Sequence, residues 1–136
     1  MGLFIIFSFS KKLEPLFMNT QQVAERLVTL CREGKNTDAI NELYDDNVVS
    51  REAKGSPMEL AEGKEAVLGK NQYWYSTVEE IHSGEVSDPI VIGNFFTVSM
   101  HMDVTYKESG RMPMQEIAVY EVKDGKIVAE QFFYNM

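Results

Sequence analysis

The hydrophobic pattern of this chain changes its period near Val78, and this change constrains the fold more than any other feature. Before Val78, apolar residues recur every three to four positions, as on one face of an α-helix. After it, apolar and polar residues alternate, most regularly in "TVSMHMDVT" (97–105), as in a strand whose two faces have different surroundings. Helices followed by consecutive strands predict an α+β fold with an antiparallel sheet.

The helical part of the pattern predicts three helices, over residues 19–34, 36–46 and 63–78. Asn19 or Thr20 can cap the first helix, and the stretch "SPMEL" (56–60) has the spacing of a capping box, which predicts a further helix start. The alternating part, with one short stretch before it, predicts strands over residues 47–52, 79–87, 90–106, 112–123 and 126–135.

The charge of the chain argues against several classes of partner. The formal net charge is -8, so neither a nucleic acid nor an anionic membrane surface is expected as a partner, because both bind basic patches. The apolar run 3–9 is too short to cross a bilayer. Residues 1–17 are predicted to be an N-terminal extension without function, followed by one domain over residues 18–136.

Cys31 is the only cysteine, so no intrachain disulfide can form and a cytoplasmic location is expected. It lies on the apolar stripe of the first predicted helix. We interpret it as a small core residue, with a reactive thiol as the alternative.

The length of the first hairpin turn determines which side chains share a face of the sheet. A two-residue turn at Ser109-Gly110 would place Asp103 opposite Glu116 and His101 opposite Ala118. Residues directly opposite each other point to the same side, so the polar residues of 97–105 would join Glu116.

The second hairpin turn determines where the last strand points. A three-residue loop over residues 123–125 would set Glu130 opposite Ala118, with Phe132 and Tyr134 on the same face. A two-residue loop would bury Glu130 as an unpaired carboxylate among methyl groups, at a cost of roughly several kcal/mol, so we prefer the longer loop. One face then carries Ser99, His101, Asp103, Glu116, Ala118, Tyr120, Val122, Glu130, Phe132 and Tyr134.

This polar row either faces bulk water or lines a pocket in a curled sheet that the three helices close. The large side chains of Tyr120, Phe132 and Tyr134 favour the pocket. In that interpretation the outer face is too apolar to remain in water, and a second copy of the chain is expected to cover it in a homodimer. The outer face would carry Phe96, Val98, Met100, Met102, Val104, Ile117 and Val119.

Three stretches carry a resemblance to a known family: "NELYDDNVVS" (41–50), "EGKEAV" (62–67) and "YEVKDGKIVAEQFFY" (120–134). With the order of elements, they resemble the cone-like fold of the nuclear transport factor 2-like superfamily. Within it, the chain is similar to the SnoaL-like proteins, relatives of ketosteroid isomerases and polyketide cyclases. The resemblance implies a pocket to which the last two strands contribute alternate residues.

The resemblance also shows where this chain departs from its relatives. The acid with which the isomerases hydrogen-bond an oxyanion falls at Ala118, and their base falls near Arg51. The cyclases carry an acid where this chain has Phe132 and a histidine where it has Glu130. Neither chemistry therefore transfers whole.

These considerations give a candidate site for proton transfer next to a carbonyl group, with no cofactor and no metal. Carboxyl groups close together raise one another's pKa, a histidine titrates near neutrality, and a tyrosine can donate to an oxyanion. The hypothesis is a cofactor-free isomerase or cyclase-like reaction on a small, partly apolar carbonyl compound, with Glu130 or Glu116 as the base and His101 and Tyr120 as its partners. The predicted catalytic residues are His101, Asp103, Glu116 and Glu130, and the predicted ligand-binding residues are Glu52, Trp74, Ser99, Tyr120, Phe132 and Tyr134.

Several alternatives stay open from the sequence. The pocket could hold a small amphipathic ligand without turnover, or the chain could be a dimeric interaction module. His101 could form a simple ion pair at the sheet edge, or could bind a divalent metal together with Glu116 and Glu130. Trp74 could be a core anchor, and either Arg51 or Glu52 could face the pocket.

Overall fold

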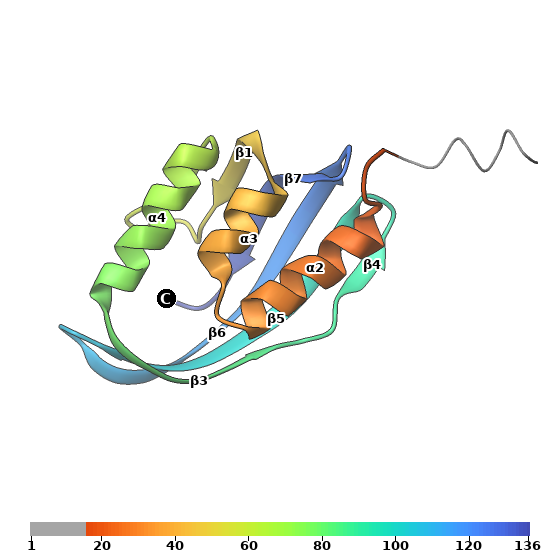
Figure 1. Ribbon diagram of the computed structural model, residues 1–136. Helices are drawn as coiled ribbons and strands as arrows, with labels where there is room; N and C mark the ends of the chain where they lie inside the picture. Colours follow the sequence, from red (N-terminus) through yellow and green to blue (C-terminus); the bar gives the residue numbers. More distant parts are fainter. Residues whose placement is uncertain (1–15) are drawn as a thin grey trace, which may run out of the picture.

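Three helices and seven strands make up residues 16–136, the part of the chain that this computed structural model describes (Figure 1). Of the predicted N-terminal extension, residues 1–15 lie outside the described residues. The helices are α2 (Thr20–Arg32), α3 (Asn36–Leu43) and α4 (Lys64–Thr77). The strands are β1 (Tyr44–Arg51), β2 (Leu60–Glu62), β3 (Val78–Val86), β4 (Ile90–Ile92), β5 (Phe95–Tyr106), β6 (Gly110–Lys123) and β7 (Lys126–Phe133).

The first helix begins as the sequence predicts. The Asn19 side chain accepts from the backbone N–H of Gln22 at 2.8 Å, and the Gln22 side chain accepts from the backbone N–H of Asn19 at 2.9 Å. This reciprocal capping box satisfies two N–H groups that the helix leaves without partners. Within residues 16–136, no helix has the length and apolar character needed to cross a membrane.

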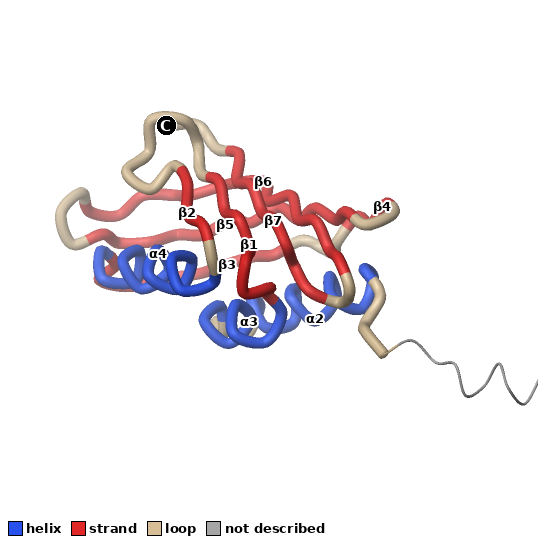
Figure 2. Tube along the Cα trace, turned by 90° about the horizontal axis from the view of Figure 1, so that it is seen from above, coloured by secondary structure: helices blue, strands red, loops and turns tan. Residues whose placement is uncertain are grey.

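The strands form one curled sheet in the order β2-β1-β7-β6-β5-β3, with β4 also paired to β5. All neighbours are antiparallel except β1 and β7, which run parallel to each other. Figure 2 shows β1 between β2 and β7. The three helices lie on the concave side of the sheet (Figure 1). The predicted α+β class and the cone-like arrangement are therefore confirmed.

Between the helices and the sheet lies an apolar core. It includes Leu27 of α2, Leu43 of α3 and Val67 of α4, which are at most 2% exposed. Phe96 of β5 and Tyr120 of β6 stack there with ring centroids 4.6 Å apart. Burying a side chain of this size contributes about 1.5–3 kcal/mol, so this layer supplies the main stabilisation of the fold.

The predicted register between β5 and β6 is wrong. Tyr106 pairs with Gly110, so the loop has three residues, and Gly110 at φ 82° ends it in a conformation that glycine adopts without strain. Met100 consequently lies opposite Glu116, and His101 lies opposite Gln115. The shift from the predicted register is an odd number of residues, so it exchanges the two faces of β5.

The predicted three-residue length of the loop between β6 and β7 is also wrong. The prediction that Glu130 and Phe132 share a face of the sheet with Glu116 is confirmed. Asp124 and Gly125, at φ 50° and 75°, form a two-residue turn, and a bulge at Val128 inserts one extra residue just after it. The extra residue restores the alternation, so Tyr120 lies opposite Glu130 and Ala118 lies opposite Phe132. Turn and bulge together therefore keep Glu130 on the same face as Glu116.

Two further elements differ from the prediction. Residues 56–59 do not begin a helix; they form turns, and the Glu59 carboxylate accepts from the backbone N–H of Gly55 at 3.3 Å. The predicted strand 90–106 divides at a turn over Gly93 and Asn94 into β4 and β5.

Candidate functional site

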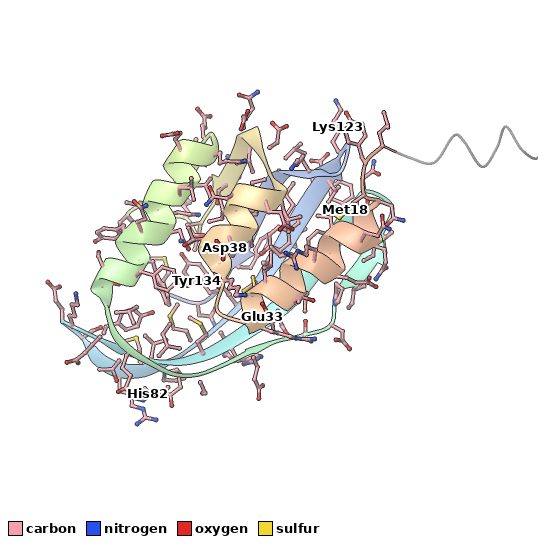
Figure 3. The ribbon with its side chains drawn as sticks, in the orientation of Figure 1. Met18, Glu33, Asp38, His82, Lys123 and Tyr134 are labelled. Atoms are coloured by element: carbon pink, nitrogen blue, oxygen red, sulfur yellow. The ribbon has the colours of Figure 1, made fainter. Side chains whose placement is uncertain are left out.

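A cavity of about 360 Å³ lies between the concave face of the sheet and the three helices. Figure 3 shows side chains from both layers directed into this space. Its polar lining consists of Asn36, Glu52, Lys70, Asn71, Gln115, Glu116 and Glu130. Its aromatic lining consists of Tyr44, Trp74, Tyr106, Tyr120, Phe132 and Tyr134. Three methionines, Met100, Met102 and Met114, belong to its apolar lining.

Glu130 lies at the buried end of the cavity and is 4% exposed. The Tyr44 hydroxyl donates to its Oε1, and the Ser50 hydroxyl donates to its Oε2 at 2.7 Å. Ser50 reaches Glu130 because β1 and β7 pair in parallel with these two residues as Cα partners. Burial raises the pKa of Glu130, and Tyr44, Lys70 and Ser50 oppose that rise by favouring the carboxylate.

Lys70 extends this network from α4. Its Nζ donates to Ser50 Oγ at 2.6 Å and lies 3.5 Å from Glu52 Oε2. The same Nζ lies 5.0 Å from the centroid of the Phe132 ring, and the Lys70 side chain is 14% exposed. One ammonium group is therefore shared between Glu52 directly and Glu130 through Ser50.

Glu116 stands apart from these pairs. No side chain within residues 16–136 hydrogen-bonds its carboxyl group, which lines the cavity from β6. Burial raises its pKa to about 7, and the negative charges of Glu52 and Glu130 contribute, while Lys70 partly offsets them. A cavity-lining carboxyl with a pKa near neutrality can both accept and release a proton under ordinary conditions.

Aromatic side chains shape the rest of the cavity. Trp74 makes edge contacts with Tyr75 and Tyr106, with ring centroids 5.1 and 6.4 Å apart, while lining the cavity itself. Tyr120 is fully buried, and burial followed by the charge of Glu130 raises its pKa well above the ordinary value. Cys31 also lines the cavity, where burial raises its pKa to about 11 and keeps it a neutral thiol.

The structure brings together seven of the ten predicted site residues. They are Glu52, Trp74, Glu116, Tyr120, Glu130, Phe132 and Tyr134. The row Val48, Ser50 and Glu52 faces inward, so Glu52 and not Arg51 reaches the cavity.

The prediction that Ser99, His101 and Asp103 line this cavity is wrong, because the changed register turns them to the convex face. Asp103 pairs there with Arg111, whose guanidinium lies 2.7 Å away and lowers the pKa of Asp103 by its hydrogen bond. His101 is exposed and lies opposite Glu85 and Gln115. The metal-binding set of His101 with Glu116 and Glu130 is therefore not assembled.

An open groove of about 1180 Å³ runs beside β6 and meets the cavity. Ser99 and His101 line this groove and not the cavity, whereas Glu116 and Tyr134 line both spaces. The cavity thus opens toward the edge of β6, where Glu116 is within reach of an entering molecule.

Sequence reasoning missed Tyr44, Ser50 and Lys70. Lys70 offered a signal, since it is the only charged residue on the apolar stripe of its helix. A lysine in that position needs a buried anion, and Glu52 and Glu130 supply two. Ser50 offered none, because its neighbour Glu130 comes from a strand 80 residues later in the chain.

The composition of the convex face also differs from the prediction. Phe96, Val98, Met100, Met102 and Val104 point to the concave side, where Phe96, Val98 and Val104 are at most 2% exposed. Ile117 and Val119 do lie on the convex face. Half-exposed Phe95 and Phe133 and the more exposed Ile90 and Ile92 join them there.

Comparison with known proteins places these observations in context. The family model for the SnoaL-like domain matches residues 18–134. A candidate SnoaL-like polyketide cyclase from Mesorhizobium loti is 37% identical in sequence with a TM-score of 0.82, over 86% of this chain and 100% of that chain. A search of curated proteins gives no match.

Two more distant structures share the fold. A candidate isomerase from Bacillus subtilis is 24% identical, with a TM-score of 0.66 over 87% of this chain and 90% of that chain. A protein with a ketosteroid isomerase-like fold from Catenulispora acidiphila, solved in complex with trimethylamine, is 15% identical. Its TM-score is 0.67 over 84% of this chain and 85% of that chain.

Proposed function

This chain belongs to the SnoaL-like family, and from that premise we propose that its cavity binds a small, partly apolar carbonyl compound and catalyses proton transfer on it. The observation that carries the proposal is Glu116, a carboxyl on the cavity wall that has no side-chain hydrogen bond within residues 16–136 and a pKa of about 7. A general base works best when its pKa lies near the working pH. Glu130 is the weaker candidate, because Tyr44 and Ser50 already occupy both of its oxygen atoms.

The proposed reaction begins with Glu116 as its carboxylate. It takes a proton from the carbon next to the carbonyl group. The electron pair of the broken C–H bond forms a carbon–carbon double bond, and the π electrons of the carbonyl group move to its oxygen, which gives an enolate. Return of the proton to a different carbon gives an isomer. Attack of the enolate carbon on a second carbonyl group gives a ring, as in a cyclase-like reaction, and the oxygen of that second group takes the proton back from Glu116. Neither route needs an oxidant, a reductant or a cofactor.

The cavity and the relatives support this substrate class. Methionine and aromatic side chains would hold the apolar part of the compound, and the polar residues would hold its oxygen atoms. The relatives from Mesorhizobium loti and Bacillus subtilis are described as a candidate cyclase and a candidate isomerase. The protein from Catenulispora acidiphila was solved in complex with trimethylamine, so at least one protein of this fold binds a small molecule.

Exchange of α-protons with deuterium oxide tests the proposal without requiring the exact substrate. A panel of cyclic and linear ketones and β-diketones is incubated with the wild-type protein and with Glu116→Gln. We expect exchange in the wild type, and a loss of about 10²–10⁴-fold in the variant, as for removal of a general base. Glu121→Gln, the same change on the same strand, is the matched control and should exchange as the wild type does. Equal exchange rates in Glu116→Gln and wild type would refute the proposal.

Non-catalytic ligand binding is the second candidate. It is favoured by the position of His101, since the predicted partner of the base lies on the other face of the sheet. A ligand that binds wild type and Glu116→Gln alike, with no proton exchange in either, would support this second function.

We propose that the working molecule is a cytoplasmic homodimer joined through the convex face. The half-exposed apolar residues Phe95, Ile117 and Phe133 support this contact. The single Cys31 supports a reducing compartment. The net charge of -8 supports partners other than nucleic acids and anionic membranes.

A further inference from the structure

We propose that Lys70 binds the carbonyl oxygen of the substrate and stabilises the negative charge on that oxygen when the enolate forms. The inference rests on the proposed proton transfer, and it assigns a catalytic role to a residue that the sequence pattern indicated only as the one charge on a helix stripe. It also narrows the ligand to compounds that place an anionic oxygen at Lys70.

The contacts of Lys70 leave it able to meet a ligand. An ammonium group has three N–H donors. Within residues 16–136, Ser50 Oγ accepts one at 2.6 Å, and Glu52 Oε2 pairs with the group at 3.5 Å. The side chain lines the cavity, so at least one donor is available to an oxygen atom that enters.

The same contacts hold the ammonium group in place. Glu130 accepts from Ser50, Ser50 accepts from Lys70, and Tyr44 fixes the other oxygen of Glu130. Ser50 is 0% exposed and Glu130 is 4% exposed, so neither reaches the cavity as openly as Lys70. Glu130 and Ser50 are thus positioning residues for Lys70, which explains why a carboxylate is buried there at all.

The movement of charge during the reaction gives Lys70 its importance. When Glu116 takes the proton it becomes neutral, and one negative charge moves to the substrate oxygen. Without a cation beside it, that charge would face the carboxylates of Glu52 and Glu130, which already raise the pKa of Glu116. A fixed ammonium group in a poorly solvated cavity stabilises such a charge far more than water-exposed groups do.

Other donors are less suited to this role. The Tyr44 hydroxyl is committed to Glu130, and Tyr120 lines the cavity but is only 2% exposed. His101, the partner expected from the sequence, lies on the convex face.

Binding of 4-nitrophenolate tests the inference without any turnover. The anion places a negative oxygen on a flat ring, as an enolate does, and its absorbance reports ionisation directly; nitrobenzene serves as the neutral analogue. We expect the wild type to prefer the anion. Lys70→Met should weaken anion binding by about ten- to hundredfold, the range for a charged hydrogen bond, and should change nitrobenzene binding less than threefold.

Three further variants sharpen this test. Lys70→Arg keeps the charge and should retain most of the preference for the anion. Glu116→Gln should strengthen anion binding, because it removes a neighbouring negative charge. Lys107→Met, at an exposed loop position, is the matched control and should bind as the wild type does.

Two results would overturn the inference: wild type that does not prefer the anion, or Lys70→Met that binds it as tightly as wild type. If Lys70→Met does not fold, a crystal structure of the wild type with 4-nitrophenolate decides. The phenolate oxygen should lie within hydrogen-bond distance of Lys70 Nζ, and any other position contradicts the role.

The outcomes also separate this inference from the proposed function. If anion binding depends on Lys70 but no α-proton exchange occurs, the role of Lys70 in binding an anionic oxygen is supported and the proposed reaction is refuted. If α-proton exchange depends on Glu116 but is unchanged in Lys70→Met, the proposed reaction is supported and the proposed role of Lys70 is refuted.

Discussion

Two glutamates on neighbouring strands have different chemical environments in this cavity. Glu130 is buried and accepts hydrogen bonds from Tyr44 and Ser50, and Ser50 in turn accepts one from Lys70. Glu116 is mostly buried but has no such donors within the described residues, and its pKa rises to about 7. Different environments for two carboxyl groups commonly separate a reactive group from a supporting one. Here the separation favours Glu116 for proton transfer and Glu130 for holding the polar network together.

The pH dependence of α-proton exchange should follow Glu116. The base is active when ionised, so the rate should rise with pH up to about 7 and level off above it. Initial rates measured from pH 5 to 9 give the profile. A rate that stays constant across this range would rule out Glu116 as the titrating group.

Glu116 should also affect stability. In the folded protein its pKa rises from the ordinary value of 4.5 to about 7. Between pH 4.5 and pH 7 the folded state therefore holds a proton that the unfolded chain has released. The free energy of unfolding should therefore fall as pH rises through this window, by about 3 kcal/mol from this residue. Urea unfolding at pH 4.5 and pH 8 measures the fall, and Glu116→Gln should lack this part of it. The control Glu121→Gln should keep the wild-type dependence, and an equal dependence in Glu116→Gln would contradict the assignment.

Removing the Glu130 carboxylate should be costly. Glu130→Ala leaves the donors of Tyr44 and Ser50 buried without acceptors and weakens the charge balance around Lys70. We expect the free energy of unfolding to fall by about 3–5 kcal/mol, as when one partner of a buried ion pair is removed. Chemical denaturation compares this variant with Glu121→Ala, and equal stability of the two would show that the network contributes little.

At the scale of the elements, the hairpin connections decide which residues reach the cavity. The three-residue loop before Gly110 turns Met100 inward and His101 outward. The two-residue turn at Asp124-Gly125 needs the bulge at Val128 to keep Glu130 facing inward. One residue more or less in either hairpin would reverse the faces of a whole strand.

Glycine is required at the second of these turns for two reasons. Gly125 has φ 75°, and a Cβ atom there would lie 2.8 Å from Phe17 Cβ. Figure 3 shows Met18 and Lys123 at the same end of the molecule, where residues 17 and 18 pass over this turn. Gly125→Ala should therefore lower stability by more than the about 1–2 kcal/mol expected from the left-handed conformation alone.

Gly93→Ala is the matched control for this prediction, because Gly93 has φ 59° and no atom within 4 Å of its added Cβ. Thermal unfolding followed by circular dichroism should give a larger drop in Tm for Gly125→Ala than for Gly93→Ala. Equal drops would show that the contact with Phe17 has no effect.

Local patterns predicted the elements better than the contacts between them. The period of two identified β5, β6 and β7, and the expense of burying Glu130 among methyl groups correctly placed it with Glu116. The β5–β6 register was wrong because "KESGR" (107–111) fits both a two-residue turn and a three-residue loop that ends in a left-handed glycine. The parallel pairing of β1 with β7 joins distant parts of the chain, so nothing in the sequence near Ser50 could indicate Glu130.

At the scale of the whole molecule, the two faces of the sheet have different surroundings. The concave face packs against three helices and encloses the cavity. The convex face carries Ile117 and Phe133, which are 52% and 50% exposed, beside polar residues such as Ser99 and His101. Apolar groups of this size on a sheet face are typical of a contact between subunits.

The proposed homodimer should dissociate when a charge is placed on this face. The chain has a mass of 15.5 kDa, so light scattering of the wild type at micromolar concentration should give twice that value. Ile117→Glu should give the single-chain mass, because burying an unpaired carboxylate in the contact is costly. Tyr73→Glu, at a 51% exposed position on α4, should remain dimeric. A wild type with the single-chain mass would contradict the dimer.

The open edge of β6 beside the groove is a site at which the protein could aggregate. β7 pairs with β6 only over residues 117–123, so among the described strands residues 110–116 have β5 on one side and no neighbour on the other. An edge segment of this kind has unpaired backbone N–H and C=O groups, with which a strand of another molecule can pair as a first step toward a fibril. Pro113 sits in the middle of this edge segment and has no N–H to offer, which interrupts any incoming ladder. The cavity can thus open to small molecules at the edge of β6, while Pro113 disfavours pairing of this edge with a strand of another molecule.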